Sequence, residues 1–224
     1  MILQLSIREL IVETSDGRAR AALLVPEASQ RERRRRGQPG VVLYMDGFGL
    51  RPALESMADR LSRQGYLVLV PDLFYRFGAY GPYDTHKAFD DDKTRAEIVR
   101  MVTGTTQAMT ERDGAAFLQA LTANGADGPI GAVGYCMGGG RAITAAAAYP
   151  DQVVAAASFH GGNLASDADD SPHRRVGSIK GRVYVGCAGV DNSFPPEQSA
   201  RLEEALRRAE VDHIIENHVG MAHG

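Results

Sequence analysis

Short segments that are almost wholly apolar alternate with amphipathic segments along most of this chain. The sequence predicts buried strands at 41–45, 66–70, 130–135, 153–159, 182–188 and 211–216. It predicts helices at 52–64, 88–102, 106–123, 141–149 and 196–209. Strands without polar alternation are typical of a parallel sheet that is buried on both faces, with helices as the crossovers. We therefore expect an α/β fold with a mainly parallel central sheet and helices on both faces.

The first 25 residues follow a different pattern. Segments 4–13 and 18–25 are predicted strands joined at Ser15–Asp16–Gly17, which is a strong hairpin signal. This hairpin would add antiparallel strands at one edge of the sheet. The 224 residues contain no internal repeat and no linker-like stretch, so we expect a single α/β domain over residues 1–224.

Composition argues against several functional classes. The net charge is −3, and the basic cluster at 31–36 precedes Gly37 and Pro39, so we expect a loop there rather than a nucleic-acid site. No apolar run is long enough to span a membrane, and we expect no membrane partner. Two cysteines are too few for a disulfide framework, which favours a cytoplasmic protein. The histidines show no metal-ligand spacing, and we expect no metal and no cofactor.

The stretch from Ala132 to Gly140 holds one nucleophilic side chain among glycines. Gly134 and Gly138 flank Cys136 in the pattern G-x-C-x-G, a nucleophile elbow with cysteine in place of serine. The nucleophile of such a turn is strained, and the glycines let the backbone close around it. The helix that follows would aim its positive end at the sulfur and favour the thiolate. A phosphate loop needs a different glycine spacing, and a buried structural cysteine is the remaining alternative.

A catalytic cysteine usually has a base nearby, and two histidines follow the carboxyl ends of predicted strands, at the same edge of the sheet as Cys136. His223 follows the last strand and Asp191 follows the strand before it, so Cys136, Asp191 and His223 have the chain order of an α/β-hydrolase triad. Asp191 would orient the imidazole, or alternatively cap the turn that follows it. His160 follows the strand 153–159 and is the other histidine that could line the pocket.

Five segments resemble the dienelactone hydrolase family, and together they extend over nearly the whole chain. They are 42–49, 65–73, 133–139, 189–196 and 220–224, of which Gly-Tyr-Cys-Met-Gly-Gly at 134–139 is the most specific. The resemblance implies an α/β-hydrolase fold with a Cys-His-Asp triad that opens the lactone ring of dienelactones to maleylacetate. It also implies that other small esters and lactones belong to the substrate range of the wider family.

The chain departs from the family pattern at two places. Position 46 is usually a glutamate that is proposed to hold the cysteine unreactive until substrate arrives, and Asp46 is one methylene shorter. This control is therefore expected to be altered here. Family members continue past the His-Gly pair with a C-terminal helix, so the arginine contacts that follow the histidine in the family cannot be carried over to this chain.

The sequence thus predicts covalent hydrolysis of a small ester or lactone by Cys136, with His223 as the base and Asp191 as its orienting acid. The backbone N–H groups of Gly47 and Met137 would bind the oxyanion. Candidate substrate contacts are Asp46, Phe48, Tyr75, Arg95, Tyr135 and His160. The alternative is a catalytically weak or inactive binding protein with the same fold. A redox enzyme is disfavoured because no resolving cysteine lies at C-x-x-C spacing from Cys136. The oligomeric state is not predicted.

Overall fold

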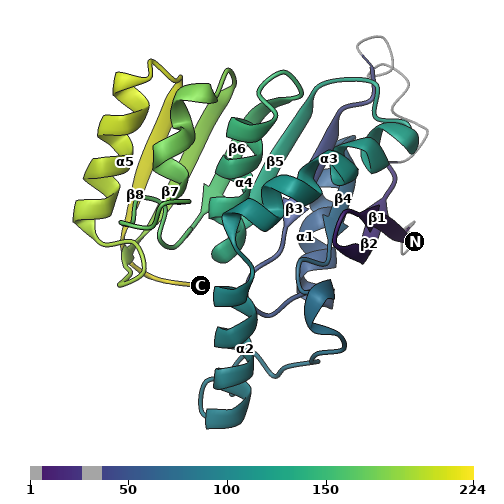
Figure 1. Ribbon diagram of the computed structural model, residues 1–224, viewed down its shortest axis with the longest axis horizontal. Coiled ribbons are helices and arrows are strands. Elements are labelled where there is room, and N and C mark those ends of the chain that lie inside the picture. Colours follow the sequence, from purple (N-terminus) through teal and green to yellow (C-terminus); the bar gives the residue numbers. More distant parts are fainter. Residues whose placement is uncertain (1–6, 27–36) are drawn as a thin grey trace.

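The computed structural model describes residues 7–26 and 37–224, and these form an eight-stranded sheet with helices on both faces (Figure 1). The basic cluster at 31–36, predicted to be a loop, lies outside the described residues. The spatial strand order is β1-β2-β4-β3-β5-β6-β7-β8. The strands are β1 (Ile7–Thr14), β2 (Gly17–Leu24), β3 (Gly40–Tyr44), β4 (Leu67–Pro71), β5 (Ile130–Tyr135), β6 (Val153–Phe159), β7 (Arg182–Val190) and β8 (His213–Ala222).

Strand directions confirm the predicted architecture. β1 pairs antiparallel with β2, and β2 pairs antiparallel with β4. Every other neighbouring pair is parallel, from β4 with β3 to β7 with β8. The carboxyl ends of six strands therefore meet at one edge of the sheet, where ligands of open α/β sheets bind.

The helices lie on the two faces of the sheet as the crossovers require. They are α1 (Pro52–Arg63), α2 (Asp92–Gly104), α3 (Gln107–Ala123), α4 (Met137–Ala148) and α5 (Pro196–Arg208), with short 3₁₀ turns η2 (Tyr75–Phe77) and η3 (Pro172–Ser178). Figure 1 shows α3, α4 and α5 on the near face and α1 behind the sheet. α2 extends beyond the edge of the sheet at which the C-terminus also lies. None of the helices in the described ranges is long and apolar enough to cross a membrane.

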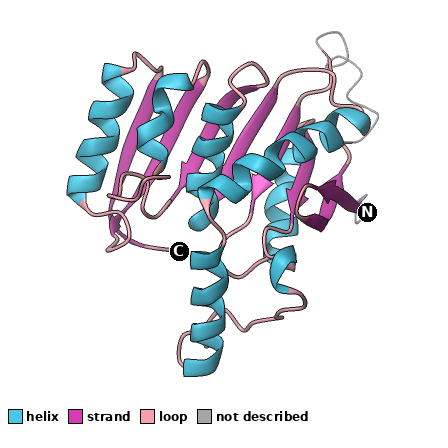
Figure 2. Cartoon of the chain, viewed as in Figure 1, coloured by secondary structure: helices cyan, strands magenta, loops and turns pink. Residues whose placement is uncertain are grey.

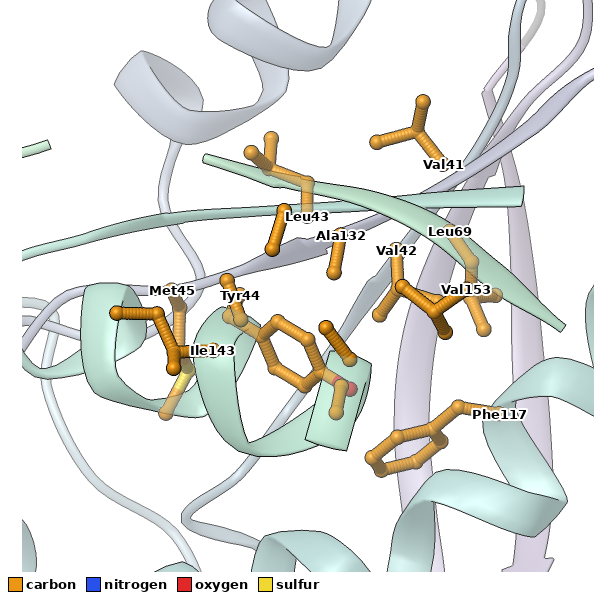
Figure 3. Close-up of a cluster of buried hydrophobic side chains, with 14 of the residues drawn as sticks. Val41, Val42, Leu43, Tyr44, Met45, Leu69, Phe117, Ala132, Ile143 and Val153 are labelled. Atoms are coloured by element: carbon orange, nitrogen blue, oxygen red, sulfur yellow. The ribbon is translucent and has the colours of Figure 1, made fainter. Parts of the chain in front are cut away.

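The core explains why the central strands lack polar alternation. Every residue of β3 and of β4 is buried, because α1 lies on one side and the α3–α4 layer on the other. Figure 3 shows the β3 side chains packed with residues from neighbouring strands and helices, and Figure 2 shows the helices that flank the sheet. The labelled members of this cluster are Val41, Val42, Leu43, Tyr44, Met45, Leu69, Phe117, Ala132, Ile143 and Val153.

Three predicted boundaries are wrong, each for a local reason. α4 begins at Met137 rather than at 141, because the glycines after Cys136 adopt helical geometry as soon as the elbow closes. α2 begins at Asp92 rather than at 88, where the Asp91 side chain accepts a hydrogen bond from the Thr94 N–H at 2.7 Å. β8 runs to Ala222 rather than to 216, because it pairs along the carboxyl half of β7 although its side chains there are exposed.

A mostly apolar groove of about 970 Å³ lies on the face that α1 covers in part. It runs over the amino-terminal halves of β3, β5, β6 and β7, with Leu61 and Gln64 of α1 on one side. Cys136 is not among its lining residues. The groove therefore lies apart from the predicted nucleophile, which follows the carboxyl end of β5.

Candidate active site

Cys136 occupies a sharp turn between β5 and α4. Its backbone has φ 53° and ψ −122°, a left-handed conformation that is strained for any residue other than glycine. A hydrogen bond from the Cys136 N–H to the Phe159 carbonyl at 3.1 Å holds the turn against β6. The predicted strand–elbow–helix geometry is therefore present, and it projects one thiol above the carboxyl edge of the sheet.

The two flanking glycines are required by close backbone contacts. A Cβ atom at Gly134 would overlap the carbonyl of Gly138 across the elbow. A Cβ atom at Gly138 would overlap the carbonyl oxygens of Tyr44 and Met45 at the end of β3. The first turn of α4 thus packs directly on the backbone of β3, which brings Cys136 next to the loop that follows β3.

We predict that Gly138→Ala destabilises the fold by at least about 3 kcal/mol, because the new methyl group meets rigid backbone instead of a movable side chain. The measurement is the free energy of unfolding in urea. Gly177→Ala is the matched control, since a Cβ atom there meets nothing within 4 Å, and its effect should stay within about 0.5 kcal/mol. Equal stability of the two variants would contradict the steric account.

His223 bridges Cys136 and Asp191. Its Nε2 lies 3.1 Å from the Cys136 Sγ, and its Nδ1 lies 2.8 Å from the Asp191 Oδ2. The three residues come from the ends of β5, β7 and β8 and meet only because these strands end at the same edge. The Asp191 carboxylate is almost fully buried, whereas the His223 ring is partly exposed. The arrangement has the connectivity of a nucleophile, a base and an orienting acid.

Asp191 makes the contacts of both alternatives that the sequence left open. Its Oδ1 caps the following turn by accepting hydrogen bonds from the Ser193 N–H at 2.8 Å and the Ser193 hydroxyl at 2.7 Å. Its Oδ2 remains for His223. Burial alone would raise the pKa of Asp191, but the hydrogen bonds from Ser193 and His223 outweigh it and lower the pKa. Asp191 is therefore ionised and rigidly oriented.

The surroundings of His223 favour its charged form. The hydrogen bond with Cys136 raises the pKa of His223 to about 9, and the bond to Asp191 adds to this effect while burial opposes it. An imidazole with this pKa holds its proton at neutral pH. His223 can thus hold a proton beside the Cys136 sulfur.

The two predicted oxyanion donors lie on either side of the elbow. Met137 is the first residue of α4, and the N–H groups of a first turn have no partner within their own helix. Gly47 follows β3, whose end packs against the first turn of α4. A Cβ atom at Gly47 would lie 3.1 Å from Val102 of α2, so the loop has little room for a side chain. Their role as oxyanion donors stays a prediction.

Asp46 is nearly buried and forms an ion pair that the sequence did not indicate. Its Oδ1 accepts a hydrogen bond from the Phe48 N–H at 2.9 Å and another from Arg51 at 2.6 Å. The Arg51 guanidinium also lies 5.3 Å from the centre of the Phe48 ring. Arg51 thus pairs with the carboxylate at the position where the family pattern has a glutamate. No sequence pattern identifies this arginine, because it is followed by Pro52 and otherwise reads as the start of an exposed helix.

Three of the predicted substrate contacts lie on segments that border the triad. The His160 ring packs edge-to-face on His223, with 4.8 Å between the ring centres. Tyr135 precedes Cys136 and stacks on Phe159, with 5.2 Å between the ring centres. Phe48 lies in the loop after β3 and packs against Phe89. Contact of these side chains with a substrate stays a prediction.

Tyr75 and Arg95 are engaged elsewhere, and we leave both out of the proposed site. The Tyr75 hydroxyl lies 2.7 Å from the Thr14 Oγ1 and donates to Asp113 at 3.1 Å, which ties it to the β1–β2 hairpin at the far side of the sheet. The Arg95 guanidinium bonds to Asp92 and to the Phe89 carbonyl, both near its own helix. Substrate contact by these two side chains stays a prediction, and their observed hydrogen bonds do not support it.

The second cysteine has a different environment. Cys187 lies within β7 and is buried, and burial raises the pKa of its thiol. A high pKa disfavours the nucleophilic thiolate. Among the described residues, no cluster of histidine, cysteine, aspartate and glutamate side chains could hold a metal ion.

Comparison with known proteins identifies the family. The model of the "Dienelactone hydrolase family" matches residues 24–224. The chain belongs to the dienelactone hydrolase family. This confirms the resemblance seen in the sequence, and it supports a carboxylic ester or lactone hydrolase as the class of enzyme.

Relatives of this dienelactone hydrolase family member are distant in sequence. A carboxymethylenebutenolidase of Rhodococcus opacus is 30% identical over 177 residues, which cover 75% of this chain and 63% of that protein. The chain thus spans a little under two thirds of that relative. A solved structure titled a dienelactone hydrolase-like promiscuous phosphotriesterase, P91, from metagenomic libraries is 25% identical with a TM-score of 0.71, covering 97% of this chain and 84% of that one.

A solved structure from Klebsiella pneumoniae subsp. pneumoniae superposes with a TM-score of 0.80 and covers 99% of this chain and 88% of that chain. The two sequences are 21% identical, so this similarity establishes the fold alone. It agrees with the α/β-hydrolase architecture predicted from the sequence.

Proposed function

We propose that this protein hydrolyses small esters or lactones by covalent catalysis at Cys136, with His223 as the base and Asp191 as the orienting acid. The observation that carries the proposal is the His223 ring, which contacts the sulfur through one nitrogen and the carboxylate through the other. Family membership supports the reaction class. We propose a small-molecule substrate and a cytoplasmic location. The proposal includes no cofactor, no nucleic acid and no membrane partner.

The first half of the reaction makes a thioester. The Cys136 thiolate attacks the carbonyl carbon, and the carbonyl oxygen becomes an oxyanion that the N–H groups of Met137 and Gly47 stabilise. The tetrahedral intermediate then expels the alkoxide of the ester or lactone, and His223 gives this oxygen a proton. For a lactone, the leaving hydroxyl group stays attached to the acyl chain.

The second half returns the enzyme to its starting state. His223, now neutral, takes a proton from water, and the resulting hydroxide attacks the thioester carbon. The carboxylic acid leaves and the sulfur regains its negative charge beside the imidazolium. Asp191 keeps the ring in one tautomer throughout, because its Oδ2 accepts the Nδ1–H bond.

Dienelactone-type lactones are the substrates that we propose first, because the Rhodococcus opacus relative is named a carboxymethylenebutenolidase. The direct test is a panel of dienelactones, simple lactones and small aryl esters. We expect turnover of at least one member, together with an acyl adduct on Cys136 that mass spectrometry of the rapidly quenched protein detects.

The rival proposal is a binding protein that keeps the fold without turnover. It predicts that no member of the panel is hydrolysed and that no acyl adduct forms, although the thiol still reacts with iodoacetamide. The Asp46–Arg51 ion pair is the feature that favours this rival, because it engages the carboxylate at the position where the family pattern has a cysteine-controlling glutamate. Adduct formation followed by release would exclude it.

A further inference from the structure

A second histidine lies against the base of the proposed triad. His160 follows β6 and His223 follows β8, and the two strands are separated by β7 in the sheet (Figure 1). Their rings nevertheless meet beyond the end of β7, with 4.8 Å between the centres and an interplanar angle of 82°. A Cβ atom on Gly224 would lie 3.2 Å from the His160 Nε2, so both residues after β8 pack on this ring.

The backbone of His160 is held in an unusual conformation. Its φ is 40°, in the left-handed region that few residues with a side chain adopt. A hydrogen bond from its N–H to the Gly186 carbonyl at 2.8 Å fixes this turn against β7. Strain of this kind persists only where the surroundings enforce it, and such positions concentrate at functional sites. Here it directs the ring across the end of β7 toward His223.

The two hydrogen bonds of His223 leave one motion of its ring restrained only by the torsions of its own side chain. They fix the direction of the line from Nδ1 to Nε2, because Asp191 and Cys136 lie at its two ends. Rotation of the ring about this line keeps both distances nearly unchanged but alters the direction of the nitrogen lone pairs and N–H bonds. A flat group packed perpendicular to the ring opposes this rotation, and His160 is such a group.

We propose that His160 is a positioning residue whose flat ring sets the orientation of the His223 imidazole between Cys136 and Asp191. The inference rests on the proposed function only in that His223 is the base for Cys136. In this proposal His160 acts through its contact with His223 and not through contact with the substrate. The proposal also explains why the rings of two residues that follow non-adjacent strands meet at the carboxyl edge of the sheet.

The charge state of His160 agrees with this role. Burial lowers the pKa of His160 below its usual value of 6.5, and the positive charge of His223 lowers it further. Asp46 after β3 and Asp191 after β7 oppose these effects, and Tyr135 of β5 packs near the ring without a charge. The His160 Nδ1 is buried, with no hydrogen-bond partner among the described residues, so a second ring proton would have no acceptor there.

The charge states of the two histidines determine in which direction pH alters their contact. His160 is mainly neutral above pH 6.5 because its pKa lies lower, whereas His223, with a pKa of about 9, is mainly protonated at neutral pH. Acid therefore adds a second positive charge beside an existing one. The packing contact then becomes repulsive, and His223 loses its orientation in the acid range below pH 6.5.

The test compares three replacements of His160 by their effect on kcat, on KM and on the rate of Cys136 alkylation by iodoacetamide. His160→Phe keeps a flat ring, His160→Leu fills the space without one, and His160→Ala removes the wall. We expect Ala and Leu to lower kcat and the alkylation rate about tenfold or more at neutral pH, with KM nearly unchanged. His160→Phe should retain most of kcat and of the alkylation rate. In acid, both quantities should fall less in His160→Phe than in the native protein.

His213→Ala is the control, because this histidine begins β8 and therefore lies at the amino edge of the sheet, opposite the triad. Thermal unfolding establishes that each variant is folded, and if Ala unfolds, the comparison of Leu with Phe carries the test. Native rates in folded His160→Leu, a change confined to KM, or equal losses in Phe and Leu would each overturn the proposal. Alkylation needs no ester, so a protein that hydrolyses nothing in the panel still tests His160, and the two proposals can fail separately.

Discussion

Cys136→Ala should abolish hydrolysis, lowering kcat/KM by about 10⁴-fold or more for any substrate that the native protein turns over. The alanine has no atom that can attack a carbonyl. The oxyanion donors can then only assist direct attack by water. The fold should remain intact, because the strained turn at this position depends on the glycines around it and not on the sulfur. The measurement is the rate with the most reactive member of the ester and lactone panel.

Cys187→Ala is the matched control, since it removes the other thiol of the chain from a buried position in β7. It should keep native kcat/KM even if it costs some stability. Iodoacetamide followed by peptide mapping provides an independent readout and should modify Cys136 first. Modification of Cys187 before Cys136, or a kcat/KM of Cys136→Ala within about tenfold of the native value, would show that the nucleophile has been assigned to the wrong residue.

The sequence predicted those features that depend on backbone topology. Apolar strands alternating with helices require parallel strands, and parallel strands bring their carboxyl ends to one edge. Cys136, Asp191 and His223 could therefore be expected at the same edge before any side-chain contact was known. The elbow was also predictable, because the glycines at 134 and 138 answer steric demands that any such turn makes.

Features that depend on which side chains meet across the fold could not be predicted in the same way. Tyr75 was expected at the pocket because it lies in an aromatic loop after a strand, but its hydroxyl bonds to a hairpin more than fifty residues earlier in the chain. Arg51 was missed for the converse reason, since only the folded loop after β3 brings its guanidinium to Asp46. The contact between His160 and His223 requires the strand order, which a single sequence does not fix.

Asp191→Asn should lower kcat/KM by about 10²- to 10⁴-fold at neutral pH while leaving the protein folded. The amide cannot stabilise the imidazolium as the carboxylate does, and it permits the other tautomer of His223. The pKa of His223 should consequently fall from about 9 toward 6.5, although the contact with Cys136 still raises it. Titration of the His223 ring by NMR measures this shift directly, and the alkylation rate of Cys136 should fall with it at neutral pH.

Ser193→Ala is the control for this variant, because it removes the hydroxyl bond to the Asp191 Oδ1 and a longer contact of 3.4 Å with the His223 Nδ1, but leaves the 2.8 Å bond between Oδ2 and His223. It should reduce kcat/KM by less than about tenfold. An equal loss in the two variants would mean that Asp191 acts mainly by shaping the turn. An unchanged His223 titration in Asp191→Asn would likewise remove the acid from the triad.

Stability as a function of pH offers a test of Asp191 that needs no substrate. A histidine whose pKa is raised in the folded state contributes stability that is fully present below pH 6.5 and is lost as the pH rises through about 9. The native protein should therefore lose unfolding free energy over this range. Because Asp191→Asn brings the folded pKa of His223 closer to 6.5, the loss should be smaller and should be complete at a lower pH. The same slope in both proteins would place the origin of the raised pKa outside the Asp191 contact.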